Sequence, residues 1–222
     1  MFDLCIFDCD GVLIDSEIIS ANMLIAELRN LDVNIDLDYV ARNFLGRSYP
    51  TVMKQIRFEF GLDLPEDFEA RYRARLLAAF ETDLRVMPGV SDVIAQLGVS
   101  WCVATSSSPQ RAQRSLEIVG LDKQVQGRIF TASEVAQGKP APDLFLHAAR
   151  QMGADPARCV VIEDSLTGIR AGLAAGMTVW RFTGGSHLHG RPLLRPADAI
   201  AQLEFASFDE FFHLGPNMRA AT

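Results

Sequence analysis

The stretch of sequence that decides the fold reads LCIFDCDGVLIDSE and spans residues 4–17. Its first four residues are apolar, as in a buried strand, and the apolar run ends at Asp8. Asp8 and Asp10 are two positions apart, so they point to the same face of an extended chain, and Gly11 lets the backbone turn away. Ligands of open α/β sheets bind beyond the carboxyl ends of strands. The two carboxylates are therefore a candidate site, although an Asp- and Gly-rich turn without a function would look the same.

The rest of the chain alternates apolar runs with helical patterns. Runs typical of buried strands cover residues 101–105, 159–162 and 178–182, with a weaker one at 128–131. Helical patterns cover residues 88–97, 109–119, 142–152 and 165–175. This alternation predicts βαβ units, and hence a parallel sheet with helices on both faces. We therefore expect an α/β, Rossmann-like core.

Residues 16–84 break this rhythm, because only helical patterns occur there. Apolar stripes at helical spacing cover residues 21–31 and 68–80, with shorter helical stretches at 37–44 and 51–60. We predict that residues 16–84 form a helical cap domain inserted after the first strand. Residues 1–15 and 85–222 would then form the core domain, and the two connections near Asp15 and residues 86–88 would act as paired hinges.

The composition excludes several classes of protein. The 222 residues are 49% apolar and 22% charged, which is typical of a globular chain that needs no disulfide or structural metal to fold. The net charge of −7 leaves no basic surplus for nucleic acid. The four cysteines lie in apolar runs without zinc-site spacing, so we expect buried, reduced thiols. No basic leader and no apolar run of about 20 residues is present, so we expect a cytoplasmic protein with no membrane partner.

Polar residues also follow the other predicted strands. Thr105 and Ser106 close the second strand and precede a helix, which favours a phosphate cradle. Lys139 lies in a stretch stiffened by prolines, and Glu163 and Asp164 end the strand over 159–162. Each residue alone is explained equally well as a helix cap or a solvated side chain. Their common position at strand ends favours one shared site.

These motifs resemble those of the haloacid dehalogenase superfamily of phosphohydrolases. Within it, the chain is similar to the branch that has a helical cap after the first strand and includes β-phosphoglucomutase and many sugar-phosphate phosphatases. The resemblance rests on Phe7–Glu17, Thr105, Lys139–Asp143, Val161–Ser165 and Gly168. It covers residue 3 to about residue 185, and all four family motifs are present in order.

The resemblance implies a role for each motif residue. Asp8 would be the nucleophile that forms an aspartyl-phosphate, and Asp10 would be the general acid–base. With the ordinary aspartate pKa of about 3.9, Asp8 would need alignment rather than activation. Thr105, the backbone N–H of Ser106 and Lys139 would hold the transferring phosphoryl oxygens.

The resemblance also implies Mg²⁺ as the cofactor. Its protein ligands would be the carboxylate of Asp8, the backbone carbonyl of Asp10 and the carboxylate of Asp164, since Mg²⁺ prefers hard oxygen donors. Glu163 would support this site indirectly or through water. The three positive charges of Mg²⁺ and Lys139 would balance the three negative charges of Asp8, Asp10 and Asp164.

The cap and the last loop leave alternatives open. Arg47 follows the glycine of a cap turn that faces substrate in the family, so it is a candidate substrate contact, with a solvated arginine as the equal alternative. The β-phosphoglucomutases carry a histidine and an arginine in the cap, and the matching positions here are Ser20 and Tyr49. His187 and His189 form an HxH pair, which we expect to lie in a mobile rim loop rather than to bind metal.

We therefore expect a Mg²⁺-dependent phosphatase acting on a small phosphorylated metabolite, a sugar or sugar-acid phosphate. The alternative is a phosphomutase of the β-phosphoglucomutase type. A dehalogenase is disfavoured because Asp10 would have no task when halide leaves. A non-catalytic binding protein on the same fold would have lost a motif residue, and every one is present. The expected assembly is a monomer or weak homodimer.

Overall fold

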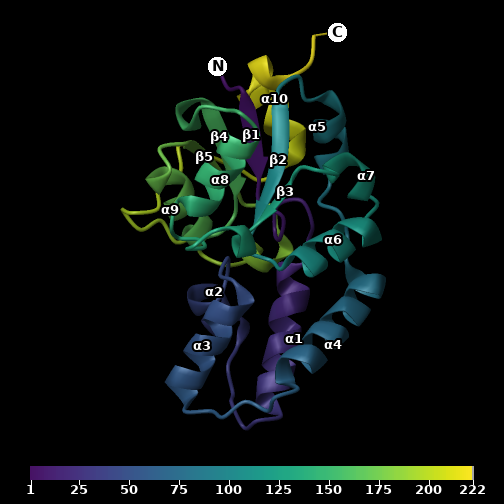
Figure 1. Cartoon of the computed structure of the whole chain (residues 1–222), viewed down its shortest axis with the longest axis vertical. Helices are drawn as coiled ribbons and strands as arrows, with labels where there is room; N and C mark the ends of the chain where they lie inside the picture. Colours follow the sequence, from purple (N-terminus) through teal and green to yellow (C-terminus); the bar gives the residue numbers. More distant parts are fainter. Residues whose placement is uncertain (222) are drawn as a thin grey trace.

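A computed structural model describes residues 1–221 and shows one central sheet of six parallel strands (Figure 1). The strands are β1 (Leu4–Phe7), β2 (Ser100–Thr105), β3 (Ile129–Thr131), β4 (Cys159–Glu163), β5 (Thr178–Phe182) and β6 (Leu203–Phe205). Their order across the sheet is β3-β2-β1-β4-β5-β6. The α/β, Rossmann-like fold expected from the alternating pattern is confirmed.

Helices cover both faces of this sheet and form a separate group beyond one end of it. The helices are α1 (Glu17–Arg29), α2 (Leu37–Asn43), α3 (Tyr49–Phe60), α4 (Phe68–Asp83), α5 (Val90–Gln96), α6 (Pro109–Ile118), α7 (Asp122–Val125), α8 (Asp143–Gln151), α9 (Leu166–Ala174) and α10 (Phe211–Leu214). The single turn α7 was not anticipated from the sequence. No helix within residues 1–221 is both long enough and apolar enough to cross a membrane.

Strands β1 and β4 are apolar almost throughout because both of their faces are buried. On β1, Phe7 packs into the core beside α5, α6 and α10, whereas Ile6 packs into the core beside α8 and α9. The four cysteines are buried and unpaired, as expected.

Helices α1 to α4 lie together at the lower end of the molecule in Figure 1. The two segments that join them to the sheet run side by side, because the Asp15 N–H donates to the carbonyl of Arg85 and the Met87 N–H donates to the carbonyl of Leu13. The α2–α3 loop touches the opposite half of the molecule, where Ser106 Oγ donates to the carbonyl of Gly46 at 3.1 Å. The space between the two halves is therefore bounded on more than one side.

Candidate active site

The ends of β1, β2 and β4 lie next to one another because these strands are neighbours in the sheet. Asp8 directly follows β1, Thr105 is the last residue of β2, and Glu163 and Asp164 are at the end of β4. The strands run parallel, so these side chains share one edge. The structure thus brings together the residues that the strand-end pattern singled out.

Lys139 joins this group as a buried ammonium whose side chain is 1% exposed. Its Nζ donates to Asp8 Oδ1 at 2.7 Å, to Glu163 Oε1 at 2.7 Å and to the carbonyl of Ala104 at 3.0 Å. Burial alone would lower the pKa of Lys139, but the two carboxylates outweigh burial and raise it. Lys139 is therefore a fixed positive charge that holds Asp8 in place.

Asp8 is 5% exposed, and its environment differs from the sequence-based expectation. Burial raises the pKa of Asp8 well above its ordinary value. The positive charge of Lys139 lowers the pKa, whereas the negative charges of Glu163 and Asp164 raise it further. The expectation of an ordinary pKa left out this desolvation of a buried carboxylate. A cation bound beside Asp8 would act in the opposite direction and favour the ionised form.

Asp10 accepts three hydrogen bonds from side chains. Ser16 Oγ at 2.5 Å and Arg111 Nη2 at 2.8 Å donate to its Oδ1, and Ser107 Oγ donates to its Oδ2 at 2.6 Å. Burial by itself would raise the pKa of Asp10, but Arg111 and the two hydroxyls outweigh burial and lower it. Asp10 is therefore ionised in this arrangement and ready to accept a proton.

Asp8, Glu163 and Asp164 form a buried acidic group whose ligand atoms lie within 4.8 Å of one another. The Oδ2 atom of Asp164 is buried and makes no hydrogen bond within residues 1–221. Gly11 packs so closely that a Cβ at its position would lie 2.1 Å from this oxygen. Carboxylate oxygens at such short range, with one of them unpaired, are the donor set that a hard divalent cation takes.

His187 lies at this acidic group rather than at the rim, so the expectation of a mobile rim loop is wrong for this residue. It is 6% exposed, and its Nε2 lies 2.9 Å from Asp164 Oδ2, without the geometry of a hydrogen bond. The loop is held in place because Ser186 Oγ donates to Asp15 Oδ1 at 2.8 Å. Burial lowers the pKa of His187. His189, two positions on, is exposed.

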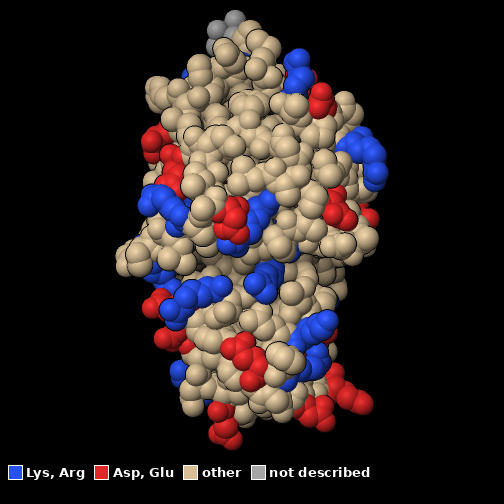
Figure 2. Space-filling view, turned by 90° about the vertical axis from the view of Figure 1, so that its left-hand side faces the viewer, with Lys and Arg blue, Asp and Glu red and all other residues tan. Residues whose placement is uncertain are grey.

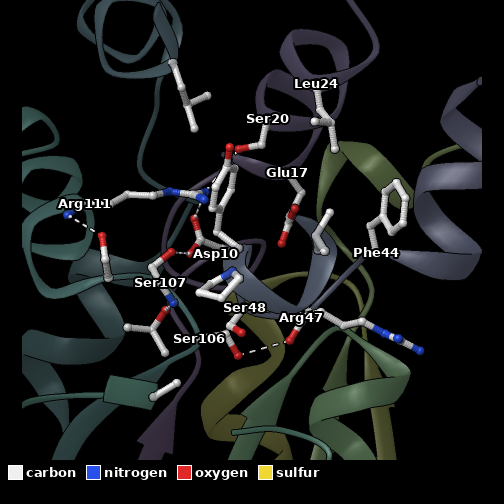
Figure 3. A pocket seen from close by; sticks show the side chains of 18 of the residues that line it. Asp10, Glu17, Ser20, Leu24, Phe44, Arg47, Ser48, Ser106, Ser107 and Arg111 are labelled. Atoms are coloured by element: carbon white, nitrogen blue, oxygen red, sulfur yellow. Dashed lines mark hydrogen bonds and ion pairs between the residues drawn. The ribbon is translucent and has the colours of Figure 1, made fainter. Parts of the chain in front are cut away.

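A cavity of about 400 Å³ lies between this group and helices α1 to α4. Asp8, Asp10, Thr105 and Ser106 line it from the sheet edge. Its apolar lining includes Leu24, Val40, Phe44, Leu45, Val52, Leu76 and Leu77. Figure 3 shows side chains from both halves converging on it.

The three residues of the helical segment considered from the sequence, Ser20, Arg47 and Tyr49, all line the cavity, but the Arg47 guanidinium turns away from its centre. The Arg47 guanidinium points away from the centre in Figure 3, and its Nη1 donates to Gln55 Oε1 at 3.1 Å on the exposed surface. Tyr49 stacks on Tyr72 with ring centroids 5.2 Å apart, and its hydroxyl is buried without a partner. Arg47 therefore does not present its charge to the cavity in this conformation.

Two cavity residues, Glu17 and Arg111, were missed by the reasoning from sequence. Glu17 is partly buried on the first turn of α1, and Figure 3 shows its carboxyl group directed into the cavity. Burial, with Asp10 and Asp164 nearby, raises the pKa of Glu17 to about 8. The sequence did hold a signal for Arg111. A cation in the first turn of α6 is unfavourable beside the positive end of the helix dipole, so its presence there indicates a role other than helix stabilisation.

We predict that Glu17→Gln stabilises the protein in chelator at high pH. The pKa of Glu17 in the folded chain, about 8, exceeds its ordinary 4.5, so its contribution to stability is complete below pH 4.5 and is lost as pH rises toward 8. Glutamine does not ionise, so the variant does not lose this stability as the pH rises. The free energy of unfolding of the variant relative to wild type should rise by on the order of 3 kcal/mol from pH 5 to pH 9. Urea unfolding at several pH values checks this, and a pH-independent difference would contradict it.

Comparison with known proteins identifies the family of the chain. The family model for haloacid dehalogenase-like hydrolases matches residues 2–176. The chain belongs to this family. It is 26% identical to the 6-phosphogluconate phosphatase of Escherichia coli over 191 residues, which are 86% of each protein.

Two solved structures of this family superpose on nearly the whole chain. A conserved haloacid dehalogenase-like protein of unknown function from Agrobacterium tumefaciens is 33% identical, with a TM-score of 0.80 and coverage of 98% of this chain and 99% of that one. A family hydrolase from Deinococcus radiodurans, solved with bound phosphate and sodium, is 31% identical, with a TM-score of 0.74 and coverage of 100% and 99%. The likeness therefore includes the helices between β1 and β2 as well as the sheet.

Proposed function

We propose that the protein is a phosphatase that hydrolyses a sugar or sugar-acid monophosphate through a phosphoryl group carried on Asp8. The observation that carries the proposal is the arrangement at the floor of the cavity. There Asp8 is held by Lys139, Asp10 lies two residues away, and Thr105 closes the adjacent strand. This arrangement supports roles for these residues as nucleophile, proton-transferring group and phosphate-binding groups around one point.

The reaction would proceed in two displacements at phosphorus. In the first, a carboxylate oxygen of Asp8 attacks phosphorus while the ester oxygen departs and takes a proton from Asp10. In the second, Asp10 takes a proton from water, the water oxygen attacks phosphorus, and the bond to Asp8 breaks to release inorganic phosphate. Asp10 is hydrogen bonded as a base in this structure, which suits the second step. For the first step it must take up a proton.

The residues present fit a Mg²⁺ ion. Asp8, Asp164 and the backbone carbonyl of Asp10 are the donors that would hold it, and the buried, unpaired Oδ2 of Asp164 is the observation that supports this. When bound, the ion would neutralise the carboxylates and the phosphoryl oxygens. Glu163 accepts from Lys139 through Oε1 and from Ser165 through Oε2, so it supports the site by orienting Lys139.

We further propose that residues 16–84 act as a cap that closes over the cavity and excludes water. The two adjacent connections at residues 13–15 and 85–87 support this, since paired linkers form a natural hinge. Charge at the junction also suits an anionic substrate. On the face in Figure 2, Lys and Arg side chains gather where the upper and lower parts meet, despite the net charge of −7.

The choice of a monophosphate ester rests on the cap. A mutase must hold a second phosphate in the cap, but the Arg47 guanidinium is turned outward and Tyr49 carries no charge. Ser20 stands where the mutases carry a histidine, and a hydroxyl does not titrate near neutral pH. The 6-phosphogluconate phosphatase among the relatives supports a sugar acid as the alcohol part.

We predict net hydrolysis rather than isomerisation. Wild-type protein with Mg²⁺ would be given a panel of sugar and sugar-acid monophosphates, and inorganic phosphate measured. A parallel reaction would contain β-glucose 1-phosphate and glucose 1,6-bisphosphate, with glucose 6-phosphate and free phosphate followed together. Phosphate release should exceed formation of glucose 6-phosphate. Isomerisation that outruns phosphate release would establish the mutase alternative, and no phosphate from any ester would contradict the proposal.

A further inference from the structure

Arg111 is a cation that lines the cavity between the two halves of the molecule. It starts from the first turn of α6 and ends between Asp10 and Ser20, as Figure 3 shows. Its Nη2 donates to Asp10 Oδ1 at 2.8 Å and to Ser20 Oγ, on α1, at 3.1 Å. The guanidinium carbon also lies 5.5 Å from the centre of the Phe80 ring on α4. One side chain of the sheet domain thus contacts both long helices of the other half.

The hydrogen-bonding capacity of this guanidinium is only partly used. Both of its side-chain hydrogen bonds use Nη2, whereas Nε is buried without a partner and no hydrogen bond within residues 1–221 engages Nη1. A buried donor without a partner is costly in a native protein, and it commonly marks a place that a ligand fills. The buried, unpaired hydroxyl of Tyr49 lines the same cavity. The cavity therefore offers two unused donor groups.

The other cations near the cavity are engaged elsewhere. Lys139 is shared by Asp8 and Glu163. Arg47 bonds Gln55 on the surface, and Arg73 is 39% exposed and pairs with Glu69 at 2.5 Å. Arg111 therefore remains as the cation inside the cavity that is open to an incoming anion.

We propose that Arg111 binds a carboxylate on the alcohol part of the substrate and so selects phosphorylated acids over phosphorylated alcohols. This inference rests on the proposed function. The planar fork of a guanidinium matches a carboxylate, and the bond to Asp10 shows that a carboxylate fits at this position. The charge also matches, since protonation of Asp10 for the first displacement leaves the guanidinium charge to balance one carboxylate of the substrate. A second phosphate dianion would leave unbalanced negative charge beside Asp10.

The position of Arg111 agrees with this role. The ester oxygen that leaves must come within hydrogen-bond reach of Asp10 to receive its proton. Because Arg111 touches the same carboxyl group, the part of the substrate beyond that oxygen enters the space next to the guanidinium. The carboxylate of a short phosphorylated acid would accept from Nη1 there, on the side of the guanidinium away from Asp10.

The test uses substrates that differ only in the group that Arg111 would bind. One pair is 6-phosphogluconate and glucitol 6-phosphate, and a shorter pair is 3-phosphoglycerate and glycerol 3-phosphate. For each pair, the ratio of kcat/KM for the acid to that for the alcohol is measured in wild type and in Arg111→Gln. Loss of the bond to Asp10 should slow both members alike, so the ratio isolates binding of the carboxylate.

Wild type should favour the acid of at least one pair by about tenfold or more, and Arg111→Gln should reduce that ratio by about tenfold or more. The acid-to-alcohol ratio of Arg111→Lys, which keeps the positive charge but not the planar guanidinium, should fall between those of wild type and Arg111→Gln. Arg114→Gln is the matched control, because Arg114 lies on the same helix and bridges to Glu81 of α4 outside the cavity. The acid-to-alcohol ratio of Arg114→Gln should equal that of wild type. Thermal unfolding monitors the fold, and Arg111→Lys carries the test if the glutamine variant does not fold.

An unchanged ratio in Arg111→Gln, with both substrates slowed equally, would overturn the inference and leave Arg111 as a residue that positions Asp10. A wild type that hydrolyses alcohols as efficiently as acids, or prefers a bisphosphate, would also overturn it while the phosphatase proposal stands. If wild type released phosphate from no ester, the proposed function itself would fail and this inference with it.

Discussion

Replacing Asp8 with asparagine should lower the rate of phosphate release by at least about a thousand-fold, because no other group then carries the phosphoryl group. Asparagine has nearly the same shape and keeps an oxygen for the Lys139 ammonium, so the fold should persist. Steady-state phosphate release, with circular dichroism of the same sample, measures both. Asp3→Asn is a suitable control, since Asp3 precedes the same strand but pairs with Arg158 on the surface.

The result has a clear alternative. If Asp8→Asn retained more than a small fraction of wild-type turnover, Asp8 would not be the nucleophile. The cavity would then have to act by positioning water directly. An inactive but unfolded variant is recognised from its circular dichroism spectrum, and Asp8→Glu, which displaces the carboxylate without removing it, then serves in its place.

Removal of divalent cations should have an effect of similar size. Chelation with EDTA should abolish phosphate release, and added Mg²⁺ should restore it, because Asp8 and Asp164 would otherwise repel the phosphate dianion. Ca²⁺ should inhibit, since its larger and looser coordination misaligns the reacting groups. Mg²⁺ should also raise the melting temperature of wild type, and Asp164→Asn should weaken that rise.

Matched readouts separate the outcomes of this experiment. The rise in melting temperature reports binding without turnover, so a loss of activity unrelated to metal would leave it unchanged. Full activity in chelator would contradict the metal assignment. A rise in melting temperature that survives Asp164→Asn would remove Asp164 from the ligand set.

Much of the fold was predictable because the physics that sets it is local. Strands buried on both faces must be apolar along their whole length, so residues 4–7 and 159–162 stand out in the sequence. The polar residues at their carboxyl ends then fall on one edge of a parallel sheet. Asp8, Thr105 and Asp164 could be expected at one edge of the sheet on that argument alone.

The rest of the site depends on contacts between distant parts of the chain. Arg111 meets Asp10 across 101 positions, and nothing near either residue in sequence indicates the partner. The burial of His187 likewise depends on the loop that Ser186 ties to Asp15. Arg47 shows the opposite case, because its place in a turn between two helices can be predicted from the sequence but the direction of its side chain cannot.

The most direct test of the central claim is to look for the phosphoryl group on Asp8. Asp10→Asn should remove the base for the second displacement, whereas p-nitrophenyl phosphate has a leaving group that departs without a proton. Mixed with that ester and quenched in acid, the Asp10→Asn variant should gain the mass of one phosphoryl group, with peptide mapping placing it on Asp8. A p-nitrophenol burst without any such adduct, or an adduct on another residue, would contradict the account.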